Sequence, residues 1–211
     1  MGIRERRERE REARRAAILD SARTLFLERG FTGTTTKQIA ERCELSEATL
    51  FFYFQSKNEI FISLLFEGID FWARGLEKIA SLDLPPKKKL ARLWKFYGKG
   101  RSEHPEYYHL SAFLARPLST VDVSDDVKAE IVRRSGENFQ RLAEILDDIL
   151  GDGNGRIGAD LLWATYLGLV VLGQSRANLG FSLHPTDKEM NAVLDLLMQG
   201  LLPDRADGDD E

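Results

Sequence analysis

The sequence is poor in the residues that build covalent cross-links and catalytic centres. Its 211 residues include one cysteine, Cys43, which cannot form an internal disulfide. The chain has no nucleophile elbow, no phosphate-binding glycine loop and no HExxH-type histidine pair. The loop that begins at residue 152 carries Trp163 where a calcium loop needs glutamate. We therefore expect no enzymatic activity, no metal site and no cofactor.

Long apolar runs are also missing. The longest uncharged stretch, residues 161–175, has fifteen residues, whereas a membrane-spanning helix needs roughly 20. No basic start followed by an apolar block marks a secretory signal. These features predict a buried helix rather than a membrane anchor, and a protein of the cytoplasm.

The net charge of −4 argues against a nucleic-acid ligand, but the charge is unevenly distributed. Residues 1–60 contain 12 Lys and Arg against 10 Asp and Glu, whereas the remainder contains 18 against 24. The first part therefore carries a net charge of +2 and the rest −6. We expect any contact with DNA to come from the first sixty residues.

Apolar residues recur at spacings of three and four, without strand-like alternation, and predict an all-helical chain of about nine helices. Capping boxes mark the starts of three of them, at Thr35 with Gln38, Ser56 with Glu59, and Thr186 with Glu189. We divide the chain into a DNA-binding domain at 1–56, a helical domain at 57–203 and an acidic tail at 204–211.

Residues 35–54 have the pattern of a helix-turn-helix. Two short helices joined by a tight turn and packed on a longer first helix place the second short helix in the major groove of DNA. Its inner core is predicted to contain Leu45, Leu50 and Phe54 with Ile39 and Ala40. Its outward face then consists of Glu47, Ala48, Thr49, Phe51 and Tyr53. A threonine hydroxyl can bond a base or phosphate, and the aromatic edges can pack on sugars and bases.

The stretch from Arg15 to Ile60 resembles the DNA-binding domain of the TetR/AcrR (tetracycline-repressor) family. Leu50, Tyr53, Phe54 and Lys57 occupy the family's Leu-Tyr-x-Tyr/His-Phe run and the lysine that follows it. The resemblance implies an all-helical homodimeric transcriptional regulator with a variable, ligand-binding C-terminal domain.

Three positions depart from the family's pattern. Glu44 stands where a turn glycine is usual, and costs on the order of 1 kcal/mol if it keeps a positive φ, so a differently shaped turn is the alternative. Ala48 replaces a frequent glycine. Phe51 replaces the usual tyrosine and therefore lacks a hydroxyl that donates to phosphate.

The resemblance also implies roles for individual residues. Thr35 would contact a phosphate at the start of the second helix, with Lys37 beside it, and Lys57 would neutralise another. Thr49 and Tyr53 would touch bases or backbone. The arginine-rich start, Arg4 to Arg15, is a further candidate for contact with DNA, in the adjacent minor groove.

Aromatic and polar residues of the C-terminal part are the candidates for an apolar or aromatic small-molecule ligand. They are Trp72, Trp94, Tyr97, Tyr108, Phe113, Arg116, Trp163, Tyr166 and Gln174. Apolar stripes near 161–180 and 187–202 are either internal core or, as the resemblance implies, the interface of a homodimer.

Two functions from different classes fit these observations best. The first is a repressor that a small ligand releases from an inverted-repeat DNA site. The second is a helix-turn-helix regulator whose C-terminal domain binds a protein partner or no ligand. A helical enzyme with an incidental DNA-like motif is a third and more remote alternative.

Overall fold

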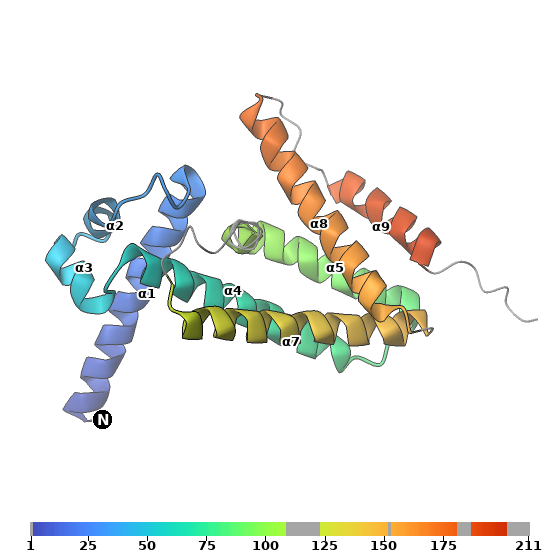
Figure 1. Cartoon of the computed structure of the whole chain (residues 1–211), viewed down its shortest axis with the longest axis horizontal. Coiled ribbons are helices and arrows are strands. Elements are labelled where there is room, and N and C mark those ends of the chain that lie inside the picture. Colours follow the sequence, from blue (N-terminus) through green and yellow to red (C-terminus); the bar gives the residue numbers. More distant parts are fainter. Residues whose placement is uncertain (1, 109–122, 152, 181–186, 202–211) are drawn as a thin grey trace, which may run out of the picture. The chain divides into compact units, whose positions relative to one another are not determined.

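The computed structural model describes residues 2–108, 123–151, 153–180 and 187–201, and all regular elements within these ranges are helices (Figure 1). The all-helical prediction is confirmed. The predicted acidic tail and the cap Thr186 lie outside the described residues. Residues 105–108 are also helical. The bounded helices are α1 (Ile3–Arg29), α2 (Thr36–Arg42), α3 (Glu47–Tyr53), α4 (Lys57–Ala80), α5 (Pro86–Glu103), α7 (Asp125–Leu150), α8 (Gly155–Asn178) and α9 (Asp187–Leu201).

The chain forms two compact units. The first consists of Met1–Gly68 and Pro105–Lys128, and the second of Ile69–His104 and Ala129–Glu211. The predicted DNA-binding domain, residues 1–56, lies within the first unit. Helix α4 belongs to both units, since its residues 57–68 are part of the first and its residues 69–80 part of the second.

Side-chain caps start the short helices of the first unit. The Thr35 hydroxyl accepts from the backbone N–H of Gln38, and the Gln38 side chain accepts from the N–H of Thr35, which confirms the predicted capping box. At α4 the box has an altered form. The Ser56 hydroxyl accepts from the N–H of Glu59, but the Glu59 carboxylate accepts from the N–H of Gln55.

The core of the first unit lies where α1 packs on α2 and α3. Ile18, Ala22 and Leu25 of α1 are buried, as are Ile39, Ala40, Leu50 and Phe54 of the helix-turn-helix. The predicted inner core is therefore correct except at Leu45, which is only half-buried in the turn. Phe26, Phe31 and Phe61 pack ring against ring and add α4 to this core.

The second unit surrounds a core of aromatic and aliphatic side chains from α4, α5, α7 and α8, and α9 packs on α5. The prediction that residues 161–175 form a buried helix is only partly right. Leu162 and Tyr166 of α8 are buried, but Leu161, Val171 and Leu172 are exposed. By length and composition alone, Gly155–Gly173 would suffice to cross a membrane, although 28% of it is buried within the chain.

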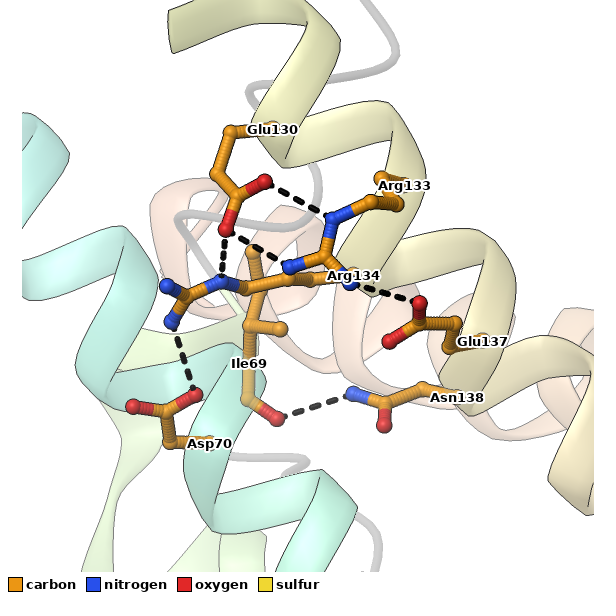
Figure 2. Close-up of polar contacts among 7 residues, drawn as sticks. All are labelled: Ile69, Asp70, Glu130, Arg133, Arg134, Glu137 and Asn138. Atoms are coloured by element: carbon orange, nitrogen blue, oxygen red, sulfur yellow. Dashed lines mark hydrogen bonds and ion pairs between the residues drawn. The ribbon is translucent and has the colours of Figure 1, made fainter.

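Polar contacts hold α7 against α4 within the second unit (Figure 2). The Asn138 side-chain amide donates to the carbonyl oxygen of Ile69 at 2.8 Å. One turn earlier on α7, Arg134 forms an ion pair with Asp70 at 3.3 Å. These contacts fix the part of α4 that immediately precedes Trp72.

Candidate nucleic-acid interface

The turn between α2 and α3 keeps the left-handed conformation despite its glutamate. Glu44 has φ 56° and is the only non-glycine residue with positive φ in the described part of the chain. The N–H of Leu45 donates to the carbonyl of Ala40 at 2.9 Å, which closes the turn. The structure therefore shows the strained alternative rather than a reshaped turn, at a cost of about 1–2 kcal/mol.

The predicted outward face of α3 is exposed except at Tyr53, and it contains one more aromatic residue. Glu47, Ala48 and Thr49 are exposed, and Phe51 is 44% exposed. Phe52, which the sequence analysis did not assign to this face, is 74% exposed and packs edge-on against Tyr53 at 5.3 Å. Tyr53 itself is half-buried. An exposed pair of phenylalanines on one short helix is unusual for a surface that contacts only water.

Hydrogen bonds orient the polar side chains at the start of α3. The Ser46 hydroxyl accepts from the N–H of Thr49 and lies 2.7 Å from the Thr49 hydroxyl. The Glu47 carboxylate accepts from the Thr36 hydroxyl of α2. A hydroxyl has one donor and two acceptor positions, so Thr49 keeps hydrogen-bonding capacity for a ligand.

The C-terminal end of α3 is held by Arg15 of α1. Its guanidinium donates to the carbonyl of Tyr53 at 2.5 Å, lies 4.0 Å from the ring centroid of Phe54, and approaches Glu59 at 4.0 Å. Sequence reasoning did not identify this role, because 38 residues separate Arg15 from Tyr53. The only sequence signal is an arginine directly before the first buried residues of α1.

Lys57, predicted to contact phosphate, also holds the connection between α1 and α2. Its ammonium donates to the carbonyls of Phe31 at 2.8 Å and Thr34 at 2.7 Å, and lies 4.3 Å from the ring centroid of Phe31. Burial lowers the pKa of this lysine. Two of its three N–H donors are thus used within the protein, and one remains for a ligand.

Thr35 and Lys37, the other predicted phosphate contacts, are both exposed at the start of α2. The Thr35 hydroxyl accepts from Gln38, while the Lys37 ammonium is 4.0 Å from Glu41 in a solvent-exposed pair. Such pairs contribute little to stability, so Lys37 is available to a phosphate.

In the second unit, five of the predicted ligand-binding residues form one cluster. Centroid distances are 5.0 Å for Trp72 and Tyr97, 5.1 Å for Tyr97 and Tyr166, 5.3 Å for Trp94 and Tyr166, and 6.0 Å for Trp72 and Trp163. Burial raises the pKa of the Tyr97 hydroxyl, and Tyr166 adds to the shift. The cluster therefore keeps Tyr97 neutral.

The remaining candidates lie elsewhere. Tyr108 is buried in the first unit and not in this cluster. Phe113, Arg116 and the side chain of Gln174 lie outside the described residues. Two residues that sequence analysis missed border the cluster, since Phe96 packs on Trp72 at 5.1 Å and stacks on Phe71 at 5.3 Å. Gly75 leaves room for Phe96, because a side chain at this position would collide with the Phe96 ring.

Comparison with known proteins assigns the helix-turn-helix to a family. Residues 18–64, which contain the buried face of α1, the turn at Glu44 and the whole of α3, match the bacterial regulatory proteins of the tetR family. Residues 18–64 of this chain are therefore similar to the DNA-binding part of tetR-family regulators. The expected family resemblance is thereby confirmed.

Relatives and solved structures extend this comparison. The chain is 29% identical over 126 residues to the transcriptional regulator RutR of Escherichia coli, and the alignment covers 58% of this chain and 59% of RutR. The chain thus spans about three fifths of that relative. The structure of the ketosteroid transcriptional regulator KstR2 of Mycobacterium tuberculosis has a TM-score of 0.71, with 19% identity and coverage of 89% and 94% of the two chains.

AibR, solved in complex with isovaleryl coenzyme A and operator DNA, has a TM-score of 0.65 and 18% identity, with coverage of 90% of this chain and 98% of AibR. Identities this low establish a shared fold alone.

Proposed function

We propose that this chain is a sequence-specific, DNA-binding transcriptional regulator of the TetR family, and that a small apolar or aromatic molecule releases it from its DNA site. The observation that carries the proposal is α3. Its outward face presents Thr49, Phe51 and Phe52 to solvent, while Arg15 and Lys57 hold the backbone on either side of the helix-turn-helix. A rigid helix with an exposed, chemically mixed face is suited to the major groove.

The residues of this surface have separate roles in the proposal. Thr49 reads a base by hydrogen bond or methyl contact, and Phe51 and Phe52 pack on thymine methyl groups and sugars. Thr35 and Lys37 contact phosphates, and the third N–H of Lys57 contacts another. The phosphate contacts set orientation, whereas the base contacts carry the sequence preference.

Selection of bound duplexes from a random DNA library tests this function. We expect an inverted repeat with half-sites about 34–36 Å apart, or somewhat more, because a two-fold dimer presents two copies of α3. A library that shows no enriched sequence after repeated rounds would overturn the proposal.

We further propose that a second copy of the chain covers the exposed apolar side chains of α8 and α9. They include Ile157, Leu161, Val171 and Leu172 of α8 and Leu196 of α9, and the exposed Leu179 directly follows α8. Two members of the predicted seam, Met190 and Leu194, instead belong to the core of the chain itself, and Val193 and Leu197 are half-buried. A glutamate introduced at position 193 or 197 to disrupt the dimer would therefore also destabilise the fold of the single chain. Leu196 and Leu172 are better positions at which to test the interface.

Leu196 and Val132 form a matched pair for that test, since each is 67% exposed, the first on α9 and the second on α7. Leu196→Glu places a carboxylate in the proposed seam and should yield a monomer at micromolar concentration in light scattering, whereas Val132→Glu should remain a dimer. If the Leu196→Glu and Val132→Glu variants dimerise equally well, α9 is not part of the dimer interface. If the wild type is instead monomeric and partitions into detergent, the exposed side chains of α8 contact a membrane.

The cluster of Trp72, Trp94, Tyr97, Trp163 and Tyr166 is the proposed environment of the ligand. Two structural neighbours suggest compounds to screen: the ketosteroid regulator KstR2 suggests ketosteroids, and AibR, solved with isovaleryl coenzyme A, suggests short-chain acyl coenzyme A thioesters. A ligand present at 100 times its Kd should add about 2.7 kcal/mol to the free energy of unfolding. If no compound shifts the melting temperature and a protein co-purifies stoichiometrically, the alternative of a protein-binding C-terminal unit holds.

Helix α4 provides a covalent route between ligand and DNA contacts. It begins at Lys57 and contains Trp72, a member of the aromatic cluster. A ligand acts only through its different affinities for the two states of the protein, and a shift from 99:1 to 1:99 requires about 5.5 kcal/mol. By reciprocity, DNA must weaken ligand binding by the same factor. The proposed site of action is the cytoplasm, where such regulators meet DNA.

A further inference from the structure

The arginine-rich start of the chain is part of helix α1. The apolar pattern predicts a first helix from about Glu10, and opposite-charge pairs four residues apart, such as Glu5 with Arg9, predict that the Arg/Glu run extends it. The structure agrees, since α1 begins at Ile3 and continues without a break to Arg29. Figure 1 shows this N-terminal part of α1 extending past α2 and α3, within the same unit. Residues 4–14 are exposed throughout.

Arginines are concentrated on one face of this extension. At 3.6 residues per turn, Arg4, Arg7, Arg11 and Arg14 lie within about 80° of one another. The same face continues along α1 as Ile18, Ala22 and Leu25, which are buried where α1 packs on α2 and α3. We call Arg4, Arg7, Arg11 and Arg14 the arginine face. It therefore lies on the side of α1 where the helix-turn-helix packs.

Arg15 connects the arginine face to the recognition helix. It follows Arg14 directly and donates to the carbonyl of Tyr53, the last residue of α3. The arginine face thus begins next to the C-terminal end of α3 and leads away from it. With a rise of about 1.5 Å per residue, Arg4 to Arg15 span about 16 Å, or roughly five base pairs.

The other arginines of the extension are engaged within the helix. Arg6 pairs with Glu10 at 3.5 Å, and the Arg9 guanidinium donates to the carbonyl of Glu5 at 3.3 Å. By contrast, the four residues of the arginine face are exposed and form no ion pair or hydrogen bond with the described residues. Glu5, Glu8 and Glu12 occupy the neighbouring face. The arginine face of the extension therefore attracts an anionic partner, whereas the neighbouring glutamate face repels it.

We propose that the arginine face binds the phosphate backbone of DNA beyond the site occupied by α3, and so lengthens the contact on each half-site by roughly five base pairs. The inference rests on the proposed DNA-binding function. A helix with side chains is about 10–12 Å across and the minor groove about 6 Å wide, so the helical start follows the backbone instead of entering the minor groove as an extended arm.

Two double variants test the proposal with equal changes in charge. Arg7→Gln with Arg11→Gln removes two members of the arginine face, and Arg6→Gln with Arg9→Gln removes the two arginines opposite. The first removes two arginines from each protomer of the dimer, so it should reduce the slope of log K against log salt by about 3.6 and weaken binding on the order of tenfold or more at 0.1 M salt. The second should leave the slope within a few tenths of the wild-type value. Glutamine and arginine have similar helix propensities, and circular dichroism checks that both variants stay helical.

The DNA in this experiment is the inverted repeat that the wild type selects, prepared with and without six further base pairs at each end. The wild type should bind the longer duplex more tightly, and the Arg7/Arg11 variant should bind both alike. Equal slopes for the two double variants on the longer duplex would overturn the role of the arginine face while leaving α3 as the reader of DNA. Failure of the wild type to select any sequence would overturn both proposals together.

Discussion

The two units use their aromatic residues in opposite ways. On α3 of the first unit, Phe51 and Phe52 are exposed, whereas in the second unit the buried Trp72 packs on Tyr97 and the buried Trp94 packs on Tyr166. Removing an exposed ring should leave the free energy of unfolding almost unchanged, but such a ring gives a large partner a surface to contact. Buried rings stabilise the core, and only a small molecule that packs among them can contact them. The difference in burial therefore separates a proposed DNA surface from a proposed ligand environment.

Alanine substitutions should show this contrast most strongly. Trp94 is 4% exposed, so Trp94→Ala should lower the free energy of unfolding by about 3–5 kcal/mol through lost burial and a cavity. Phe52→Ala should change it by no more than about 0.5 kcal/mol but weaken DNA binding. Urea titrations followed by circular dichroism measure both. Similar losses of stability in the two variants would show that α3 is as much a core helix as α5.

The next largest effect concerns base reading by α3. Thr49→Ala should cost about 1–3 kcal/mol in binding to the selected DNA and less on random DNA, because base contacts carry specificity. Thr49→Ser keeps the hydroxyl beside Ser46 and removes only the methyl group. It therefore separates a hydrogen bond from a contact with thymine. Fluorescence anisotropy with both DNA types provides the affinities, and equal losses on both types would contradict base reading by Thr49.

Two lysines predicted to contact phosphate should respond differently. Lys57→Gln breaks the hydrogen bonds to Phe31 and Thr34 and should lower the free energy of unfolding by about 1–3 kcal/mol. Lys37→Gln should leave stability within about 0.5 kcal/mol and reduce the salt slope of the dimer by about 1.8, because each protomer loses one phosphate contact. Thermal melts and binding at several salt concentrations distinguish the two. An unchanged melting temperature in Lys57→Gln would show that its contacts add no stability.

Local sequence signals predicted much of the first unit. The caps at Thr35 and Ser56 act within a few residues, and both mark helix starts in the structure. A hydrogen bond within four residues depends on sequence spacing alone, so it can be predicted without the fold.

Contacts between distant residues could not be predicted in this way. Arg15 and Tyr53 are 38 residues apart, and Lys57 and Phe31 are 26 apart, so their contacts depend on how the helices pack. Periodicity likewise identified the apolar stripe of α9 but not which members face the chain's own core. Met190 and Leu194 are buried while Leu196 is exposed, although all three are apolar.

A smaller effect is expected in the turn of the helix-turn-helix. Glu44→Gly removes the strain of a positive φ, worth about 1–2 kcal/mol, but makes the unfolded chain more flexible by about 0.5–1 kcal/mol. We expect a net gain in stability of up to about 1 kcal/mol, with DNA affinity unchanged. Differential scanning calorimetry measures the gain. A lower melting temperature would show that the Glu44 side chain makes a favourable contribution that outweighs the strain.

The smallest effect is expected on the surface of the second unit, at Glu130. Hydrogen bonds from Arg133, and then from Arg134, lower the pKa of this carboxyl to about 2 (Figure 2). Because the pKa is lower in the folded chain, the stabilisation is present above the ordinary pKa and is lost as the pH falls toward 2. Glu130→Gln should therefore lose part of the acid dependence of unfolding between pH 4.5 and pH 2. The group is exposed, so the difference should be slight, and a larger acid dependence in the variant would contradict the sign.

The central claim is that the exposed face of α3 recognises a DNA sequence, and one ratio tests it most directly. The affinity of the wild type for its selected inverted repeat is measured against that for a scrambled duplex of equal length, at one salt concentration. Specific binders reach ratios of about 10³ or more, and we predict a ratio of this size that falls sharply when one half-site is scrambled. A ratio near one at every salt concentration would show that the chain binds DNA only by charge, and would contradict the account.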